Sequence, residues 1–161
     1  MSDEHVISVV AENKTGVLAH VAGMFAGRGF NIESIAAGPT HEDNLSRMTI
    51  VVRGDESVLE QVRKQLGKII DVIRVADFAG QDYVERDLML IKVAAPPAKR
   101  GEIFELAEVF RGKVVDIGAK HVMLELSGPK QKIEAMIALL RPYGIKEISR
   151  AGRIAMARGA K

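Results

Sequence analysis

The sequence contains no cysteine and no tryptophan, and aromatic residues make up only 4% of its 161 residues. The lack of cysteine excludes disulfide bonds, thiolate metal sites and a cysteine nucleophile. The scarcity of aromatic side chains leaves few surfaces on which the bases of single-stranded nucleic acid could stack. We therefore expect no nucleic-acid partner, and the composition suits a reducing compartment, with the cytoplasm as the default.

Strong charge of either sign is also lacking, because 23 lysines and arginines stand against 21 acidic residues. This balance gives no indication that the chain binds a phosphate backbone or an acidic membrane surface. The N-terminal residues lack the basic segment, apolar core and cleavage site of a signal peptide. No apolar run has the length of a membrane span. We predict a cytoplasmic protein without a membrane partner.

Apolar periodicity changes between strand and helix spacing in a regular order in the first half of the chain. The order is βαββαβ, with a strand at 5–11, a helix from Gly16, strands at 30–39 and 46–53, a helix at 58–66 and a strand at 69–78. This is the split βαβ arrangement, a four-stranded antiparallel sheet with both helices on one face. We predict that the other face has no cover from its own chain and invites a partner.

A similar order recurs after Gly80. Patterns there predict a strand at 88–94, a helix at 103–110, a strand pair within 114–127, a helix at 133–140 and a last strand at 145–154. The sequence therefore predicts an α+β fold of two ferredoxin-like βαββαβ domains, 1–80 and 81–161.

The loop between the first strand and the first helix, at 11–18, is a candidate site for a small zwitterion. The free backbone N–H groups and the positive end of a helix can hold a carboxylate without an arginine. Gly16 allows a ligand to approach the backbone, and the Asn13 amide offers both donors and an acceptor. The alternative is that Thr15 or Asn13 caps the helix and Gly16 only relaxes the turn.

A second candidate segment, at 27–34, leaves the first helix and enters the second strand. By itself it is typical of a glycine helix terminus followed by Asn31 as a turn residue. Together with the first loop it belongs to a set of three blocks, which read NKTGVL at 13–18, GFNIES at 29–34 and LSRMTI at 45–50. In this combination the chain resembles the ACT domain of the acetohydroxyacid synthase small subunit family. The segment at 110–116, FRGKVVD, resembles the start of that family's C-terminal domain.

The resemblance implies a non-catalytic regulatory subunit in branched-chain amino acid biosynthesis, with an N-terminal ACT domain and no catalytic residue of its own. It implies a homodimer whose ACT sheets join edge to edge, and a catalytic subunit as partner. Valine, or leucine or isoleucine, would bind at the dimer interface and confer feedback inhibition. The effector-binding residues would be Asn13, Thr15, Gly16, Val17 and Leu18 from one chain, with Asn31 and Ile32 from the other.

The same resemblance implies that this chain binds no cofactor. Thiamine diphosphate, Mg and FAD would belong to the catalytic subunit, whose activity the small subunit raises. Val17, which follows the loop glycine, could narrow the effector pocket, so the choice among the three branched-chain amino acids stays open.

Other kinds of site find little support in the residues. The four histidines have no metal-ligand spacing, so we expect no metal site. No phosphate-binding loop or serine elbow is present. Two alternatives remain, an ACT-type amino-acid sensor of another enzyme and a small ferredoxin-like enzyme, although no nucleophile or base converges on a site.

Overall fold

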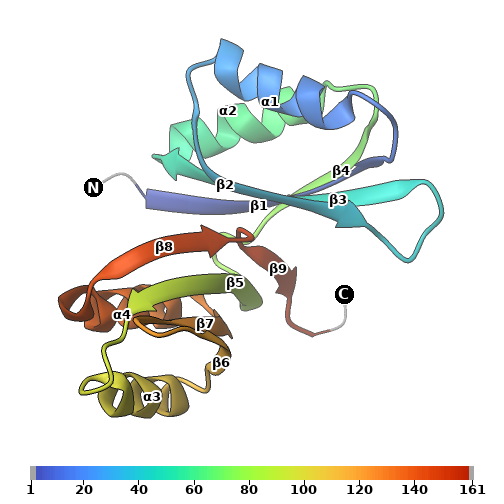
Figure 1. Ribbon diagram of the computed structural model, residues 1–161. Helices are drawn as coiled ribbons and strands as arrows, with labels where there is room; N and C mark the ends of the chain where they lie inside the picture. Colours follow the sequence, from blue (N-terminus) through green and yellow to red (C-terminus); the bar gives the residue numbers. More distant parts are fainter. Residues whose placement is uncertain (1–2, 160–161) are drawn as a thin grey trace. The chain divides into compact units, whose positions relative to one another are not determined.

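The structure is a computed structural model that describes residues 3–159 and forms two compact units (Figure 1). The first unit runs as far as Val84 and also includes the chain from Arg153 onward, and the second unit is Glu85–Gly152. Each unit combines an antiparallel sheet with two α-helices. The predicted α+β fold with two βαββαβ-like units is confirmed.

The sheet of the first unit has the strand order β2-β3-β1-β4. Its elements are β1 (Asp3–Glu12), α1 (Val17–Gly27), β2 (Asn31–Pro39), β3 (Leu45–Gly54), α2 (Glu56–Leu66) and β4 (Val72–Asp77). Both helices lie on the same face of this sheet (Figure 1). Alternate residues of β1 and β3 point toward the helices, as Ile7 and Ile50 do in paired positions. This sheet order leaves β2 and β4 as the two edges.

Helix α2 shows how local sequence sets one of these elements. Asp55 occupies the N-cap position, and its carboxylate accepts a hydrogen bond from the backbone N–H of Val58 at 3.0 Å. Leu59, Val62 and Leu66 then follow at helical spacing and are buried against the sheet. Capping and apolar periodicity therefore agree, and α2 begins and ends close to its predicted limits.

The other face of the first sheet is partly covered by the chain itself. Val6 and Val51, paired across β1 and β3, are buried with Phe78 and Ala155, and Tyr83 packs against them. Ala155 belongs to β9 (Ile154–Ala157), which pairs with β5 (Tyr83–Ala94). The prediction that this face has no cover from its own chain is therefore wrong for this part of the sheet. The physical reason is that exposed Val6 and Val51 would be costly, and the C-terminal strand buries them.

The second unit repeats the architecture with the strand order β6-β7-β5-β8. Its remaining elements are α3 (Arg100–Val109), β6 (Lys113–Ile117), β7 (His121–Gly128), α4 (Lys130–Leu140), the 3-10 helix η1 (Arg141–Tyr143) and β8 (Ile145–Arg150). Apolar residues of α3 and α4 are buried with those of β5 and β7 in one cluster. This cluster is separate from the core of the first unit.

The end of the second unit differs from its sequence-based description. A single last strand was expected at 145–154, but β8 ends at Arg150 and β9 starts at Ile154. Gly152 lies between them with a φ of 91°, and its N–H donates to the Asp87 carboxylate at 3.2 Å. Arg153 then donates to Glu4 of β1 at 2.6 Å. The compact units consequently differ from the domains 1–80 and 81–161, because the C-terminal segment returns to the first unit.

Candidate functional site

The loop from Asn13 to Gly16 is held by backbone hydrogen bonds that leave the side chain of Asn13 free. The N–H of Asn13 donates to the carbonyl of Asn44 at 2.7 Å, and the N–H of Glu12 donates to the carbonyl of Asp71 at 2.9 Å. The side chain of Asn13 is exposed and forms no hydrogen bond within residues 3–159. A fixed backbone with an unengaged amide is suited to hydrogen bonding with a small polar ligand.

The N-terminus of α1 has no side-chain cap. Gly16 is the N-cap residue, with a φ of 88°, and no side chain accepts a hydrogen bond from the first turn. The alternative that Asn13 or Thr15 caps the helix is therefore wrong. The first turn also contains no acidic residue. Helix N–H groups and the positive end of the helix dipole are thus available to an anion.

The only cation of this loop is already paired. Lys14 forms ion pairs with the carboxylate of Glu12 and, at 3.7 Å, with that of Asp71. The hydrogen bond and charge of Glu12, with a smaller contribution from Asp71, raise the pKa of Lys14 above its ordinary value. A ligand carboxylate would therefore be held by backbone N–H groups and an asparagine amide in preference to this ammonium group.

The two residues after Gly16 have different surroundings. Val17 is 5% exposed and belongs to the core cluster, together with Val21 and Phe25. Its side chain packs into the interior, so Val17 itself offers almost no surface to a ligand. Leu18 is 49% exposed. Leu18 is thus the aliphatic side chain of the first turn that a ligand or a second chain can contact.

Asn31 and Ile32 open β2, the edge strand on the other side of the sheet from β4. Asn31 is exposed, and its amide donates to the Glu33 carboxylate at 3.4 Å, which in turn pairs with Arg53 at 2.9 Å. Ile32 is half-buried and packs against the core. The structure therefore presents Asn31 at an open sheet edge, with Ile32 as its apolar neighbour.

Within one chain, the strand register places Asn13 and Asn31 at opposite ends of the sheet. Asn31 pairs with Arg53, and Arg53 pairs with Glu4 near the start of β1. Asn13 follows Glu12 at the other end of this ten-residue strand. At about 3.3 Å per residue the two asparagines are separated by roughly 30 Å along the strand direction. One chain cannot bring both of them to a single amino acid.

Gly16→Ala tests the loop geometry. An added Cβ would meet no atom within 4 Å, so the cost comes only from a backbone with a φ of 88°. We expect the free energy of unfolding to fall by about 1 kcal/mol. The matched control is Gly23→Ala in the interior of α1, where the added Cβ also meets nothing and φ is helical. That change should stabilise by roughly 0.5–1 kcal/mol in urea denaturation. Effects of the same sign would contradict a strained turn at Gly16.

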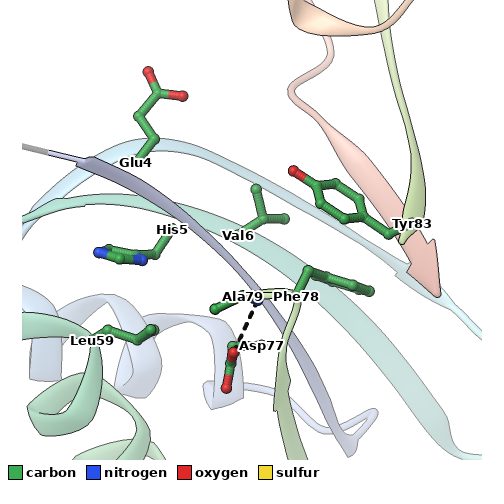
Figure 2. Close-up of a pocket in the computed structure, with 8 residues that line it drawn as sticks. All are labelled: Glu4, His5, Val6, Leu59, Asp77, Phe78, Ala79 and Tyr83. Carbon is green, nitrogen blue, oxygen red and sulfur yellow. Dashed lines mark hydrogen bonds between the residues drawn. The ribbon is translucent and has the colours of Figure 1, made fainter. Parts of the chain in front are cut away.

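The first unit has a cavity of about 100 Å³ (Figure 2), and no residue of this loop lines it. Its polar lining groups are engaged elsewhere, since Asp77 accepts from the N–H of Ala79 and pairs with Arg63, and His5 lies 3.1 Å from the Gly54 carbonyl. A wider groove runs along α2 and is lined by Glu56, Ser57, Leu59, Glu60, Arg63, Lys64 and Val75. None of the predicted effector-binding residues lines either of them.

Within residues 3–159, no group of three acidic or histidine side chains is placed to hold a metal ion. No helix in the same range is both long and apolar enough to cross a membrane.

Comparison with known proteins covers both units. Residues 7–74 match the model of the AHAS small subunit-like ACT domain, and residues 86–159 match that of the small subunit of acetolactate synthase. A probable acetolactate synthase small subunit of Archaeoglobus fulgidus is 54% identical over 98% of this chain and 99% of its own length. The chain belongs to the acetolactate synthase small subunit family. The resemblance predicted from the three sequence blocks is confirmed.

Further relatives support membership in the acetolactate synthase small subunit family. The acetolactate synthase small subunit of Aquifex aeolicus is 49% identical over 96% of this chain and 81% of its own length. The crystal structure of the small subunit from Thermotoga maritima superposes with a TM-score of 0.89, at 40% identity and 99% coverage of both chains. A small subunit implies a catalytic subunit as partner.

One feature of this region was not found from the sequence. The turn before β4 anchors the candidate loop through Asp71, which bonds to Glu12 and Lys14. Asp71 is distant from both in the chain, and only the pairing of β1 with β4 brings them together. An isolated aspartate after two isoleucines gives no recognisable signal.

Proposed function

We propose that this chain binds valine, or leucine or isoleucine, between the ACT domains of a homodimer, activates the catalytic subunit and confers feedback inhibition on it. The observation that carries the proposal is the roughly 30 Å between Asn13 and Asn31 in one chain, together with the uncapped helix beside Asn13. The Asn13 loop and the Asn31 sheet edge are each open, and within one chain neither has the other beside it.

Edge-to-edge pairing of two β2 strands supplies the missing half. β2 runs from Asn31, level with Glu4, to Pro39, which pairs with Ser46 opposite Ala11. In an antiparallel pair related by a two-fold axis, the start of one strand lies beside the end of the other. Asn31 of a second copy then comes to the end of the sheet at which Asn13 lies. Two equivalent sites result.

The residue types suit a zwitterion with an aliphatic side chain. The first turn of α1 offers N–H groups to the carboxylate, and the amides of Asn13 and Asn31 can accept from the ammonium group and donate to the carboxylate. Leu18 and Ile32 provide apolar contacts. At about 1 kcal/mol for each of its few heavy atoms, valine would bind with roughly micromolar affinity, which suits the sensing of a metabolite pool.

Regulation requires only a modest coupling energy. An effector that favours one dimer arrangement by about 1–3 kcal/mol changes the activity of a bound partner several-fold or more. We assign thiamine diphosphate, Mg and FAD to the catalytic subunit, and we place both subunits in the cytoplasm.

Reconstitution with the catalytic subunit tests the proposal. Acetolactate formation by the purified catalytic subunit is measured with and without this chain, and then with each of the three branched-chain amino acids. We expect the chain to raise the rate several-fold and at least one of the amino acids to lower it again. Unchanged activity on addition of the chain would refute the regulatory role, and activation without any inhibition would refute the effector site.

A further inference from the structure

The turn into β4 carries the most exposed large apolar side chain of the described residues. Ile70 is 91% exposed, and Ile73 in β4 is 57% exposed. Ile69, immediately before them, is buried in the core at 7%. The chain therefore uses one isoleucine to close its core and directs the next away from it.

A strand irregularity explains the exposure of Ile73. Val10 of β1 pairs with Arg74, but Ala11 pairs with Val72, so Ile73 is left without a partner in the register. Such a bulge turns a side chain away from its regular direction. β4 is also the outer strand of its sheet, with only β1 as a neighbour. An exposed apolar edge strand favours association with other chains. Proteins ordinarily protect such an edge unless a partner binds there.

Two cations border these isoleucines. Lys68 and Arg74 are exposed, and neither forms an ion pair within residues 3–159. We call the surface formed by Lys68, Ile70, Ile73 and Arg74 the β4 edge patch. Its chemistry fits a protein surface that offers an apolar recess bordered by carboxylates.

The β4 edge patch is joined to the candidate effector loop. Asp71, between the two isoleucines in sequence, accepts a hydrogen bond from the N–H of Glu12 at 2.9 Å, and its carboxylate pairs with Lys14 at 3.7 Å. A shift of the loop upon ligand binding would therefore act directly on this segment. A partner bound at the patch is thus in contact with the element that the effector biases.

We propose that the β4 edge patch is the surface through which this chain binds the catalytic subunit of acetolactate synthase. This inference rests on the proposed function, in which the opposite edge, β2, is occupied by a second copy. The β4 edge then remains open in the dimer, where its exposed isoleucines and two cations, which form no ion pair within residues 3–159, are available to the enzyme.

The experiment measures the affinity of the full-length chain for the purified catalytic subunit by biolayer interferometry. Ile70→Ser should weaken binding roughly tenfold, and the double change with Ile73→Ser still more. Ile70→Leu should stay near the parent value because it keeps the apolar area. Val109→Ser is the matched control, since Val109 is a 78% exposed aliphatic residue of α3. Its effect should be less than about twofold.

Two accompanying measurements separate the possible outcomes. Valine binding and dimer mass should be unchanged in Ile70→Ser, which supports a role in contacting the enzyme alone. If the variant binds the catalytic subunit as tightly as the parent chain does, this inference is refuted and the proposed function stands. A change of dimer mass would refute it in favour of a contact between copies. A parent chain that fails to bind the catalytic subunit would overturn both proposals.

Discussion

Asn13→Ala is expected to abolish inhibition by valine while leaving activation of the catalytic subunit intact. The change removes an exposed amide that bonds to no other described group, and it keeps the backbone N–H that donates to Asn44 at 2.7 Å. Loss of two hydrogen bonds to a charged ligand weakens binding roughly a hundredfold. Calorimetric titration with valine and the acetolactate assay measure the two properties separately. Gln61→Ala, which removes an exposed amide from α2, is the control and should change neither.

Mixed dimers give this prediction its sharpest form. Asn13→Ala and Asn31→Ala homodimers should both lack an intact site. A dimer of one chain of each kind combines both changes in one site and restores the other site, so mixing the two insensitive proteins should recover partial inhibition. Two asparagines that act within a single chain would give no recovery. Loss of activation together with inhibition in the Asn13 variant would instead show that the loop is structural.

Arg150→Met should destabilise the second unit by about 3 kcal/mol. The Asp87 residue is 2% exposed, and Arg150 donates to one of its carboxylate oxygens from Nε at 2.7 Å and from Nη2 at 2.6 Å. Methionine keeps much of the volume but leaves a buried carboxylate with only the N–H of Gly152. Hydrogen exchange of the β5 and β8 amides measures the loss within this unit.

Glu134→Ala is the matched control, because it removes the exposed half of the same network. Arg150 donates to Glu134 at 2.8 Å, but the Glu134 side chain is 48% exposed, so its loss should cost under about 1 kcal/mol. Adding Asp87→Asn to Arg150→Met should regain part of the stability, since the uncompensated charge is gone. Equal hydrogen-exchange protection of these amides in the parent and in Arg150→Met would rule out a stabilising role for the pair of Arg150 and Asp87.

The order of helices and strands could be predicted from the sequence because the apolar residues of each element recur at helix or strand spacing. Leu59, Val62 and Leu66 at helical spacing and alternating residues around Ile50 are local signals, and the structure confirms both. The last strand was not accessible in the same way. Its division at Gly152 depends on Asp87, and its continuation depends on the apolar surface of Val6, both distant in the chain.

The candidate site was likewise predictable from the sequence only in part. Asn13 and Gly16 occur together in a short loop, so residue types and chain order were sufficient to single them out. The separation of Asn13 from Asn31 follows from strand register, which no local pattern specifies. The bulge at Ile73 and the bond from Asp71 to Glu12 likewise depend on which strand pairs with β4.

In the proposed dimer site, the opposite placement of Asn13 and Asn31 on one sheet makes effector binding depend on protein concentration. A binding pocket that needs two molecules vanishes when they dissociate, so dilution lowers apparent effector affinity even though every atom of each monomer is unchanged. By the same mass action, effector added to a dilute protein sample promotes association of the chains. Sedimentation of dilute samples with and without valine would then reveal a ligand-dependent rise in mass.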